Sequence, residues 1–301
     1  MALLGVVGGL AAFAQAPALL AATGDDLADP CAYRRRADGQ APVVIHSLED
    51  LQAMEKSLGG SYMLGASIDA SATAHWNGGA GFVPIGRPGR AFSGIFDGRG
   101  HTIRGLHIDR PGESHVGLIG HARNAALCNV GLVEGRIHGG ENVGALAGSQ
   151  RTADGGTAHI FHVHATAQVR GVGDNVGGLV GHNDAFHGAS TISHAYATGA
   201  VTGGGDNVGG LVGHNEAYKG LAHIAIAYAS GQVTGAGSNV GGLVGHNEAS
   251  SGTASITDAY ATGGVQGRDY AGGLVGYNDA IGGMVSISRA YSSGTVVARG
   301  R

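Results

Sequence analysis

NVGGLVGHN occupies residues 175–183, and the same nine letters return at 207–215 and at 239–247. A variant, YAGGLVGYN, stands at 270–278. The copies therefore begin 32, 32 and 31 residues apart. Self-similarity at a fixed period of this length identifies a repeat architecture, in which each repeat forms one structural unit that packs on its neighbours.

A second module lies between these copies. It reads ISHAYATGAVTG from Ile192, IAIAYASGQVTG from Ile224 and ITDAYATGGVQG from Ile256. Both modules are short β-prone runs closed by glycines, which is typical of strands separated by tight corners. Helix-period segments of useful length are absent from the sequence after about residue 60. The pattern therefore predicts an all-β chain.

A repeat of about 32 residues with several short strands predicts a β-solenoid that adds one coil per repeat. Each strand then pairs in parallel with its copy in the next coil, about 4.8 Å away, so that equivalent residues stack into ladders. The alternative, a β-propeller, usually needs blades of about 40 residues or more. One predicted ladder points inward and consists of Leu179, Leu211, Leu243 and Leu274. A second is built of amides that bond one another at a corner, namely Asn183, Asn215, Asn247 and Asn278.

A short helix is predicted ahead of the coils, where residues 47–58 read SLEDLQAMEKSL. Ser47 is the expected N-cap, Asp50 completes an acidic variant of the capping box, and Gly59 ends the helix. A helix at this place would cover the open edge of the first coil, which an uncapped solenoid exposes to pairing.

The repeats resemble the GLUG-motif family, whose signature is Gly-Leu-hydrophobic-Gly. The match is GLVG at residues 178–181, with copies that begin at Gly210, Gly242 and Gly273. The stretches GFVPIG at 81–86 and FSGIFDGRGHTI at 92–103 are similar to the lead-in of that family, and the resemblance spans about residues 44–297. It implies a right-handed parallel β-helix of bacterial secreted or surface proteins, including haemagglutinin-like adhesins. The predicted fold is thus an all-β, right-handed parallel β-helix (β-solenoid) with a short N-terminal capping helix.

The beginning of the chain is apolar. Residues 1–22 contain no Asp, Glu, Lys or Arg and end in Leu-Ala-Ala, which is typical of a secretory signal peptide. We therefore divide the chain into a signal peptide (1–22), an N-terminal linker (23–43), the capping helix with the first coils (44–110) and GLUG-type repeats (111–301). The mature chain is expected to lack a transmembrane span and to lie outside the cell or on the bacterial surface. Because a repeat strand runs almost to Arg301, we expect further coils or a partner at that edge.

Composition excludes several classes of protein. Glycine supplies 59 of 301 residues, but it does not recur at every third position, so the chain is not collagen-like. The 22 acidic residues outnumber the 18 basic ones, which argues against nucleic acid as a partner. Two cysteines are too few for a disulfide framework. Cys128 lies in an apolar run, and we interpret it as a small buried hydrophobe, with a bridge to Cys31 as the alternative.

Three histidines, His182, His214 and His246, share one position of the repeat. Imidazoles at coil spacing could bind a metal, but Tyr277 takes this position in the fourth copy and removes the ligand. We therefore favour stacked neutral rings over a metal site. This interpretation predicts a loss of stability below about pH 6, where imidazolium charges would repel one another.

An acidic column follows two positions later and consists of Asp184, Glu216, Glu248 and Asp279. Like charges in a ladder repel unless water solvates them or a cation bridges them. The main expectation is a chain without a cofactor, and the alternative is a weak Ca²⁺ site at this column.

A tyrosine column offers a candidate binding face, namely Tyr196, Tyr228, Tyr260 and Tyr291. Exposed rings could stack on sugars, whereas inward rings would belong to the core. We favour the core, because Ile192 and Tyr196 are four residues apart and a regular strand places such residues on one face.

Signs of catalysis are weak. Paired carboxylates for glycoside hydrolysis should project from neighbouring strands, but the strands in the middle of the repeats carry Ala, Gly, Val and Ser. The sequence has neither HExxH nor a Gly-x-Ser-x-Gly elbow. We therefore expect a secreted or surface repeat protein that binds a glycan or a surface protein and catalyses nothing. The alternatives are a polysaccharide-active β-helix enzyme or its accessory domain, with Asp97 as one starting point, and a structural stalk.

Overall fold

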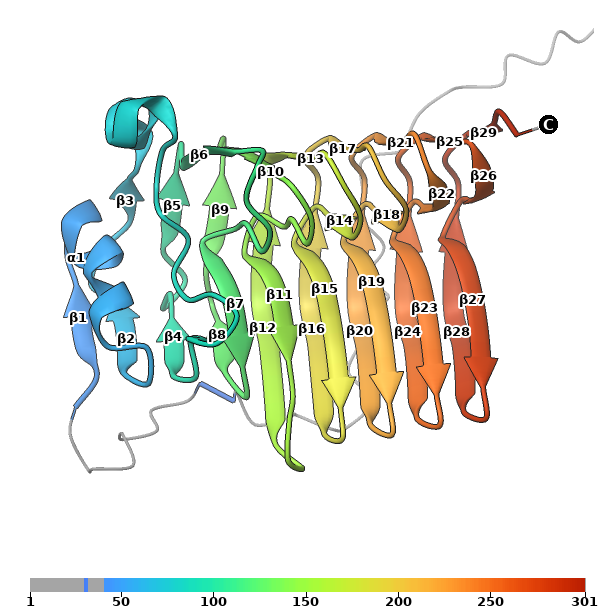
Figure 1. Ribbon diagram of the computed structural model, residues 1–301, viewed down its shortest axis with the longest axis horizontal. Helices are drawn as coiled ribbons and strands as arrows, with labels where there is room; N and C mark the ends of the chain where they lie inside the picture. The colour runs from blue at the N-terminus through green and yellow to red at the C-terminus, as the bar shows by residue number, and fades with distance from the viewer. Residues whose placement is uncertain (1–29, 32–40, 301) are drawn as a thin grey trace, which may run out of the picture.

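The computed structural model describes residues 30–31 and 41–300, and these residues form a β-solenoid of parallel strands (Figure 1). The predicted all-β solenoid is therefore confirmed. The predicted signal peptide (1–22) and most of the predicted linker (23–43) lie outside the described residues.

Four sheets run along the solenoid, and every pairing between their strands is parallel. Sheet A follows the path β1 (Val43–Ile45), β2 (Ser61–Leu64), β4 (Ile95–Asp97), β8 (Ala126–Cys128), β12 (Thr157–Ala165), β16 (Ala189–Ala197), β20 (Leu221–Ala229), β24 (Thr253–Ala261) and β28 (Met284–Ser292). It also includes β3 (Ile68–Asp69), β5 (Thr102–Arg104) and β9 (Gly131–Val133). Sheet B contains β6 (His107–Arg110), β10 (Arg136–Gly139), β13 (Gln168–Gly171), β17 (Val201–Gly203), β21 (Val233–Gly235), β25 (Val265–Gly267) and β29 (Val296–Ala298).

The other two sheets complete each coil. Sheet C contains β7 (Ile119–Arg123), β11 (Ala147–Arg151), β15 (Val180–Phe186), β19 (Val212–Tyr218), β23 (Val244–Ser250) and β27 (Val275–Ile281). Sheet D contains β14 (Val176–Gly177), β18 (Val208–Gly209), β22 (Ser238–Gly241) and β26 (Asp269–Gly272). One repeat thus contributes β14 to sheet D, β15 to sheet C, β16 to sheet A and β17 to sheet B.

The helix at the N-terminal end of the solenoid is present. It consists of α1 (Leu48–Ala53), continued by the 3₁₀ turn η1 (Met54–Lys56), and a second 3₁₀ segment, η2 (Ser71–Gly79), follows later. The Asp50 backbone N–H donates to Ser47 Oγ over 3.0 Å, and the Ser47 N–H donates to the Asp50 carboxylate over 3.1 Å. This capping box fixes the start of α1, and Leu51 and Met54 are then fully buried in the core. The predicted capping helix is therefore confirmed, but its helical turns end at Lys56, before the expected end at Gly59 (Figure 1).

The core lies between sheets A and C and changes in character along the axis. Large side chains fill the first coils, including the fully buried Phe82, Phe92 and Phe96. In the later coils, columns of small and branched residues form the core, and they include the four leucines of the motif. Leu179, Leu211 and Leu243 are fully buried, and Leu274 is partly buried. At the tip where sheets A and C meet, the buried residues of the cluster are alanines, and Val285 of the last coil packs against them. The alanines are Ala185, Ala217, Ala222, Ala249 and Ala254.

A ladder of asparagine amides runs through this core along the solenoid axis. Asn183, Asn215 and Asn247 are fully buried, and each Nδ2 donates over 2.7 Å to the Oδ1 of the next coil, ending at Asn278. Ser190 Oγ of sheet A donates to Asn183 Oδ1 over 2.6 Å and so ties the two sheets together. Buried amides are stable here because each one has partners in the neighbouring coils.

Replacing Asn215 with leucine is expected to lower the free energy of unfolding by about 2–4 kcal/mol. The change leaves Asn183 Nδ2 without its acceptor and Asn247 Oδ1 without its donor, and each buried unsatisfied group costs roughly 1–3 kcal/mol. Urea unfolding followed by circular dichroism measures the loss. Asn278→Leu is the matched control, because Asn278 is exposed and the change removes one acceptor near water. Equal losses in the two variants would contradict the account.

A second asparagine column turns the corner before sheet D. Asn142, Asn175, Asn207 and Asn239 have φ values of 53°, 58°, 61° and 59°, the left-handed region that asparagine tolerates better than most residues. From Asn175 onward, each Nδ2 donates to the Oδ1 of the preceding coil over 2.9 Å. The first residue of the NVGGLVGHN motif therefore forms both a turn and an axial hydrogen bond.

The two cysteines differ from the sequence-based interpretation. Cys31 and Cys128 form a disulfide that closes a sequence separation of 97 residues. Cys128 is fully buried beside Phe161, as a small hydrophobe would be, but its thiol is bridged. The expectation of an unbridged thiol was wrong, because neither spacing nor composition indicates that residue 31 returns to sheet A.

Candidate functional site

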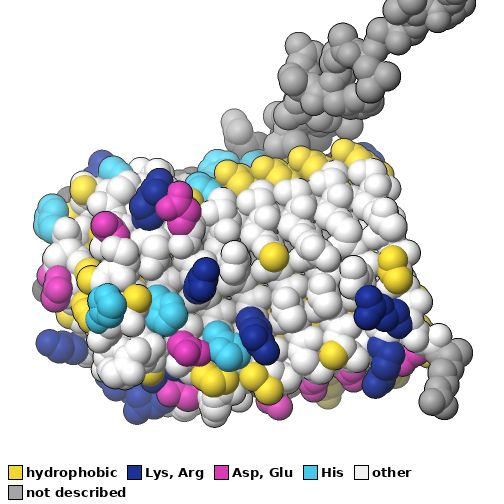
Figure 2. Space-filling view, turned by 90° about the horizontal axis from the view of Figure 1, so that it is seen from above, with side chains coloured by type: hydrophobic (Ala, Val, Ile, Leu, Met, Phe, Trp, Pro, Cys, Tyr) yellow, Lys and Arg dark blue, Asp and Glu magenta, His cyan; other side chains and the backbone are white. Residues whose placement is uncertain are grey.

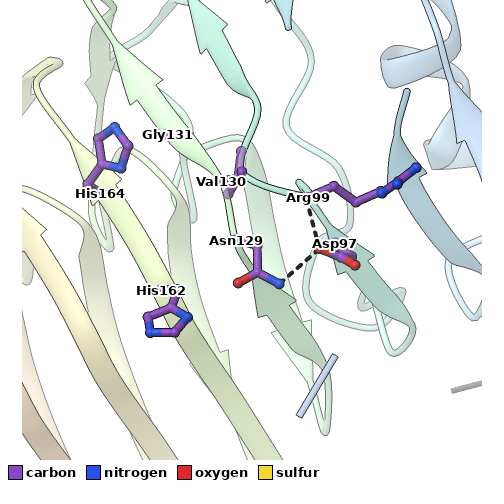
Figure 3. Close-up of a pocket in the computed structure, with 8 residues that line it drawn as sticks. Asp97, Arg99, Asn129, Val130, Gly131, His162 and His164 are labelled. Atoms are coloured by element: carbon purple, nitrogen blue, oxygen red, sulfur yellow. Dashed lines mark hydrogen bonds between the residues drawn. The ribbon is translucent and has the colours of Figure 1, made fainter. Parts of the chain in front are cut away.

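A cavity of about 500 Å³ opens on the outer surface of the early coils (Figure 3). Figure 3 shows two imidazoles on one side of it and the polar groups of an earlier coil on the other. Its walls are Asp97, Arg99, Gly100, Asn129, Val130, Gly131, His162 and His164. Residues from three successive strands of sheet A, or from the turns that follow them, therefore meet at one place.

Asp97 organises the polar wall of the cavity. Its Oδ1 accepts hydrogen bonds from Asn129 Nδ2 over 3.0 Å and from the Arg99 backbone N–H over 2.8 Å. Arg99 has a φ of 50°, so the FDGRGH turn holds it in the left-handed region and leaves its side chain exposed. The Asp97 carboxylate and the Asn129 amide thus lie side by side, whereas the Arg99 guanidinium extends away from them, with Nη1 3.8 Å from Met63 Sδ of the preceding coil.

His164 forms the opposite wall. It pairs in register with Gly131 of the preceding coil, where a Cβ atom would lie only 2.4 Å from His164 Nε2. The glycine therefore makes room for the imidazole at the rim of the cavity. Burial lowers the pKa of His164 below its usual value, so that the ring is neutral at pH 7.

The tyrosine column continues from His164 along the outside of sheet A. The His164 ring stacks on Tyr196 at 4.9 Å, and the tyrosine rings follow one another at 4.7, 4.9 and 5.3 Å with planes within 7° of parallel. Because each ring face contacts the next ring, the column presents ring edges and hydroxyl groups to solvent. The members of the column are Tyr196, Tyr228, Tyr260 and Tyr291.

The expectation that these tyrosines belong to the core was wrong. Ile192 is fully buried, whereas Tyr196 of the same strand is half-buried. Between Ile192 and Tyr196, His194 has a φ of 52°, which breaks the regular alternation of the strand and turns Tyr196 outward. The same left-handed position recurs in successive coils at His162, His194, Ile226, Asp258 and Arg289.

The histidine and acidic columns lie on sheet C, on the opposite long face from the tyrosines. The rings of His182, His214 and His246 stack at 4.8 and 4.7 Å, with planes within 4° of parallel. Tyr277 is in register with His246 but its ring is tilted by 44°. Figure 2, seen from the side of sheet B, shows hydrophobic side chains along one long edge and acidic side chains along the other.

Each histidine of this column donates to an acidic side chain of the next coil. The Nε2 atoms of His182, His214 and His246 lie 3.0, 3.2 and 2.7 Å from carboxylate oxygens. Their acceptors, in the same order, are Glu216, Glu248 and Asp279. We call these six residues the His–carboxylate ladder. The fourth acidic residue, Asp184, instead pairs with Arg151 at 3.2 Å.

Burial and hydrogen bonds shift the protonation of this ladder. Burial lowers the pKa of His214 to about 4, and the hydrogen bond from His214 lowers the pKa of Glu248 to about 2. The hydrogen bond from His182 likewise lowers the pKa of Glu216, whereas burial raises that of Asp184. At pH 7 the central imidazole, His214, is therefore neutral beside the ionised carboxylates of Glu216 and Glu248. The Ca²⁺ site at the acidic column remains a prediction.

Stability is expected to fall as the pH drops from 6.5 towards 4. Burial lowers the pKa values of both His121 and His214 to about 4 from 6.5, so the unfolded chain binds protons in this range that the folded chain does not. Each imidazole then costs about 2 kcal/mol at pH 5, and Glu248 adds a loss below its ordinary pKa of 4.5. Urea midpoints at pH 7.5 and 5, measured with a chelator present, test this. Equal midpoints would contradict it, and His121→Gln should reduce the difference.

The sequence comparisons agree with this architecture. The model of the GLUG motif matches residues 173–202 and 236–266. Halomucin from Haloquadratum walsbyi (strain DSM 16790 / HBSQ001) is 41% identical over an alignment of 166 residues, which covers 52% of this chain and 2% of halomucin. The chain therefore carries GLUG repeats, as predicted, and it spans only a small part of the length of this relative.

Sequence reasoning missed most of the cavity. Asp97 was singled out within its turn, but its partners Asn129 and His164 come from the two following coils. The repeat period was the available signal, because it places His164 at the head of the tyrosine column. The glycine at 131 and the left-handed residue at 162 carry no such signal in a single sequence.

Proposed function

We propose that this chain of GLUG repeats is a surface repeat protein that binds a glycan in the cavity beside His164 and catalyses nothing itself. The observation that carries the proposal is the cavity of about 500 Å³, in which the Asp97 carboxylate and the Asn129 amide face two imidazoles. Sugar hydroxyl groups both donate and accept hydrogen bonds, so they match a wall that offers both functions.

The tyrosine column extends this binding face. It begins at the cavity wall, where His164 stacks on Tyr196. Its ring edges and hydroxyl groups form a regular row with one tyrosine per coil, which suits an extended polymer whose units repeat along the axis. We therefore expect the cavity to anchor one sugar and the tyrosine column to contact the units that follow.

Binding without hydrolysis follows from the composition of the cavity. Glycoside hydrolysis usually needs two carboxyl groups on either side of the scissile bond. Among the described residues that line the cavity, Asp97 is the single carboxylate, and its Oδ1 already accepts two hydrogen bonds. The wall is thus suited to holding a sugar.

A surface location is supported by the GLUG motif and by the similarity to a protein named as a mucin. Within the described part of the chain, no helix is long and apolar enough to span a membrane. The apolar segment at 1–22, read as a signal peptide, provides a route for export.

The proposal is tested by incubating the purified chain with a panel of immobilised polysaccharides and host glycans. Bound protein and newly formed reducing or unsaturated ends are read from the same wells. Binding without new ends is the expected result. New ends would overturn the non-catalytic assignment, and a chain that binds no glycan would favour a protein ligand or a purely structural stalk.

A further inference from the structure

We infer that the His–carboxylate ladder of sheet C is a binding site for one divalent transition-metal ion, with Zn²⁺ as the best match. Two overlapping sets of donor atoms carry the inference: His182, His214 and Glu216 form one set, and His214, His246 and Glu248 form the other. Within each set, one ligand atom per residue lies within 4.8 Å of the others. The inference is independent of glycan binding, which involves the opposite face.

The donor chemistry selects the metal. Two imidazoles and one carboxylate are a ligand set that Zn²⁺ uses in sites that keep an open position, whereas Ca²⁺ prefers oxygen ligands throughout. The Nε2 to Oε2 distances are 3.0 and 3.2 Å. They are close to the separation of about 3.4 Å between two ligand atoms of a tetrahedral zinc site. An ion could therefore replace the proton that each pair shares. The second imidazole of each set has a ligand atom within 4.8 Å of these two atoms.

Charge favours occupancy by a cation. Among the described residues, the ion-pair partners of Glu216 and Glu248 are all histidines. The one arginine that forms an ion pair with the acidic column is Arg151, and its partner is Asp184. Neighbouring strands place the carboxylates roughly 4.8 Å apart, so their charges repel one another. A divalent ion between two coils would neutralise this repulsion.

The shared ligand sets the stoichiometry. His214 belongs to both donor sets, and its ring is held between those of His182 and His246 at 4.8 and 4.7 Å. Its two ring nitrogens could serve different sets, but ions in both positions would lie only about one coil spacing, roughly 4.8 Å, apart, and two divalent charges at that distance repel strongly. The ladder should therefore bind one ion per chain, in either of two alternative positions.

The test is Zn²⁺ binding to the full chain after chelator treatment, measured by calorimetry and by equilibrium dialysis. One ion per chain is expected, with Ca²⁺ unable to displace it. His214→Gln removes a ligand from both positions and should weaken binding at least tenfold. His182→Gln and His246→Gln each leave one position intact and should weaken binding only about twofold. His223→Gln, on the outer face of sheet A, is the control and should bind as the wild type does.

Circular dichroism and melting in chelator identify any variant that fails to fold. Glu216→Gln provides a second test, since it keeps the side-chain shape, removes a carboxylate from one position and should again cost about twofold. Three results would overturn the inference: no Zn²⁺ binding by the wild type, two or more ions per chain, or wild-type affinity in His214→Gln.

Discussion

Valine in place of Gly210 is expected to unfold the central coils, with a loss of about 4 kcal/mol or more in the free energy of unfolding. A Cβ atom at this position would lie 2.1 Å from the Gly242 carbonyl oxygen and 2.8 Å from the Ala229 Cβ. The cost exceeds the roughly 1–3 kcal/mol of ordinary overpacking, because the obstacle is backbone of the next coil and not a side chain that can rotate.

The same backbone contact recurs at Gly178 and Gly242, which explains the glycine at these copies of the motif, whereas at Gly273 of the last copy the nearest atom is the Ser292 side-chain oxygen at 2.4 Å. The Cβ atom would lie 2.2 Å from a carbonyl oxygen at Gly178 and 2.1 Å from one at Gly242. The coils cannot move apart to relieve it, since parallel strands on both sides of the motif fix their spacing.

Gly112→Val is the matched control for this change. Its Cβ atom would meet no atom within 4 Å, and its backbone is not left-handed. Urea unfolding of the two variants separates the contact from the general cost of valine in place of glycine. Equal midpoints in Gly210→Val and Gly112→Val would contradict the packing described for the motif.

The second large effect is expected on binding. His164→Ala should weaken the affinity for the best glycan of the panel at least tenfold, about 1.4 kcal/mol, because the change removes one wall of the cavity. The fold should survive, since the side chain points outward from the strand and packs on Tyr196 without entering the core.

Tyr260→Ala and Tyr218→Ala provide the comparison for this prediction. Tyr260 lies in the tyrosine column two coils beyond Tyr196, and its loss should cost less than that of His164. Tyr218 lies on sheet C, stacked on Phe186 on the other long face, and its loss should cost nothing. A larger effect at Tyr260 than at His164 would shift the binding site from the cavity to the column.

The repeat period made the fold predictable. Residues that stand 31 or 32 positions apart can stack only if each repeat closes one coil, so the parallel pairing follows from copies such as His182 and His214. The capping helix was equally predictable, because Ser47 and Asp50 form the capping box that begins its first turn.

Side-chain direction was less predictable. One left-handed residue, His194, reverses the alternation of β16 and moves Tyr196 from the core to the surface. Histidine, isoleucine, aspartate and arginine all occupy this position in different coils, so no residue type marks it. Contacts between coils, such as His214 with Glu248 and Cys31 with Cys128, likewise depend on geometry that spacing alone does not give.

The central claim, that a glycan occupies the cavity beside His164, is tested most directly by chemical footprinting of the histidines. The chain is treated with diethyl pyrocarbonate, with and without the best soluble glycan, and the modified imidazoles are identified by mass spectrometry. Protection of His162 and His164, with no change at His182 and His246 on the opposite face, is the predicted result. Protection confined to the opposite face, or unchanged modification of His162 and His164 when the glycan is bound, would contradict the claim.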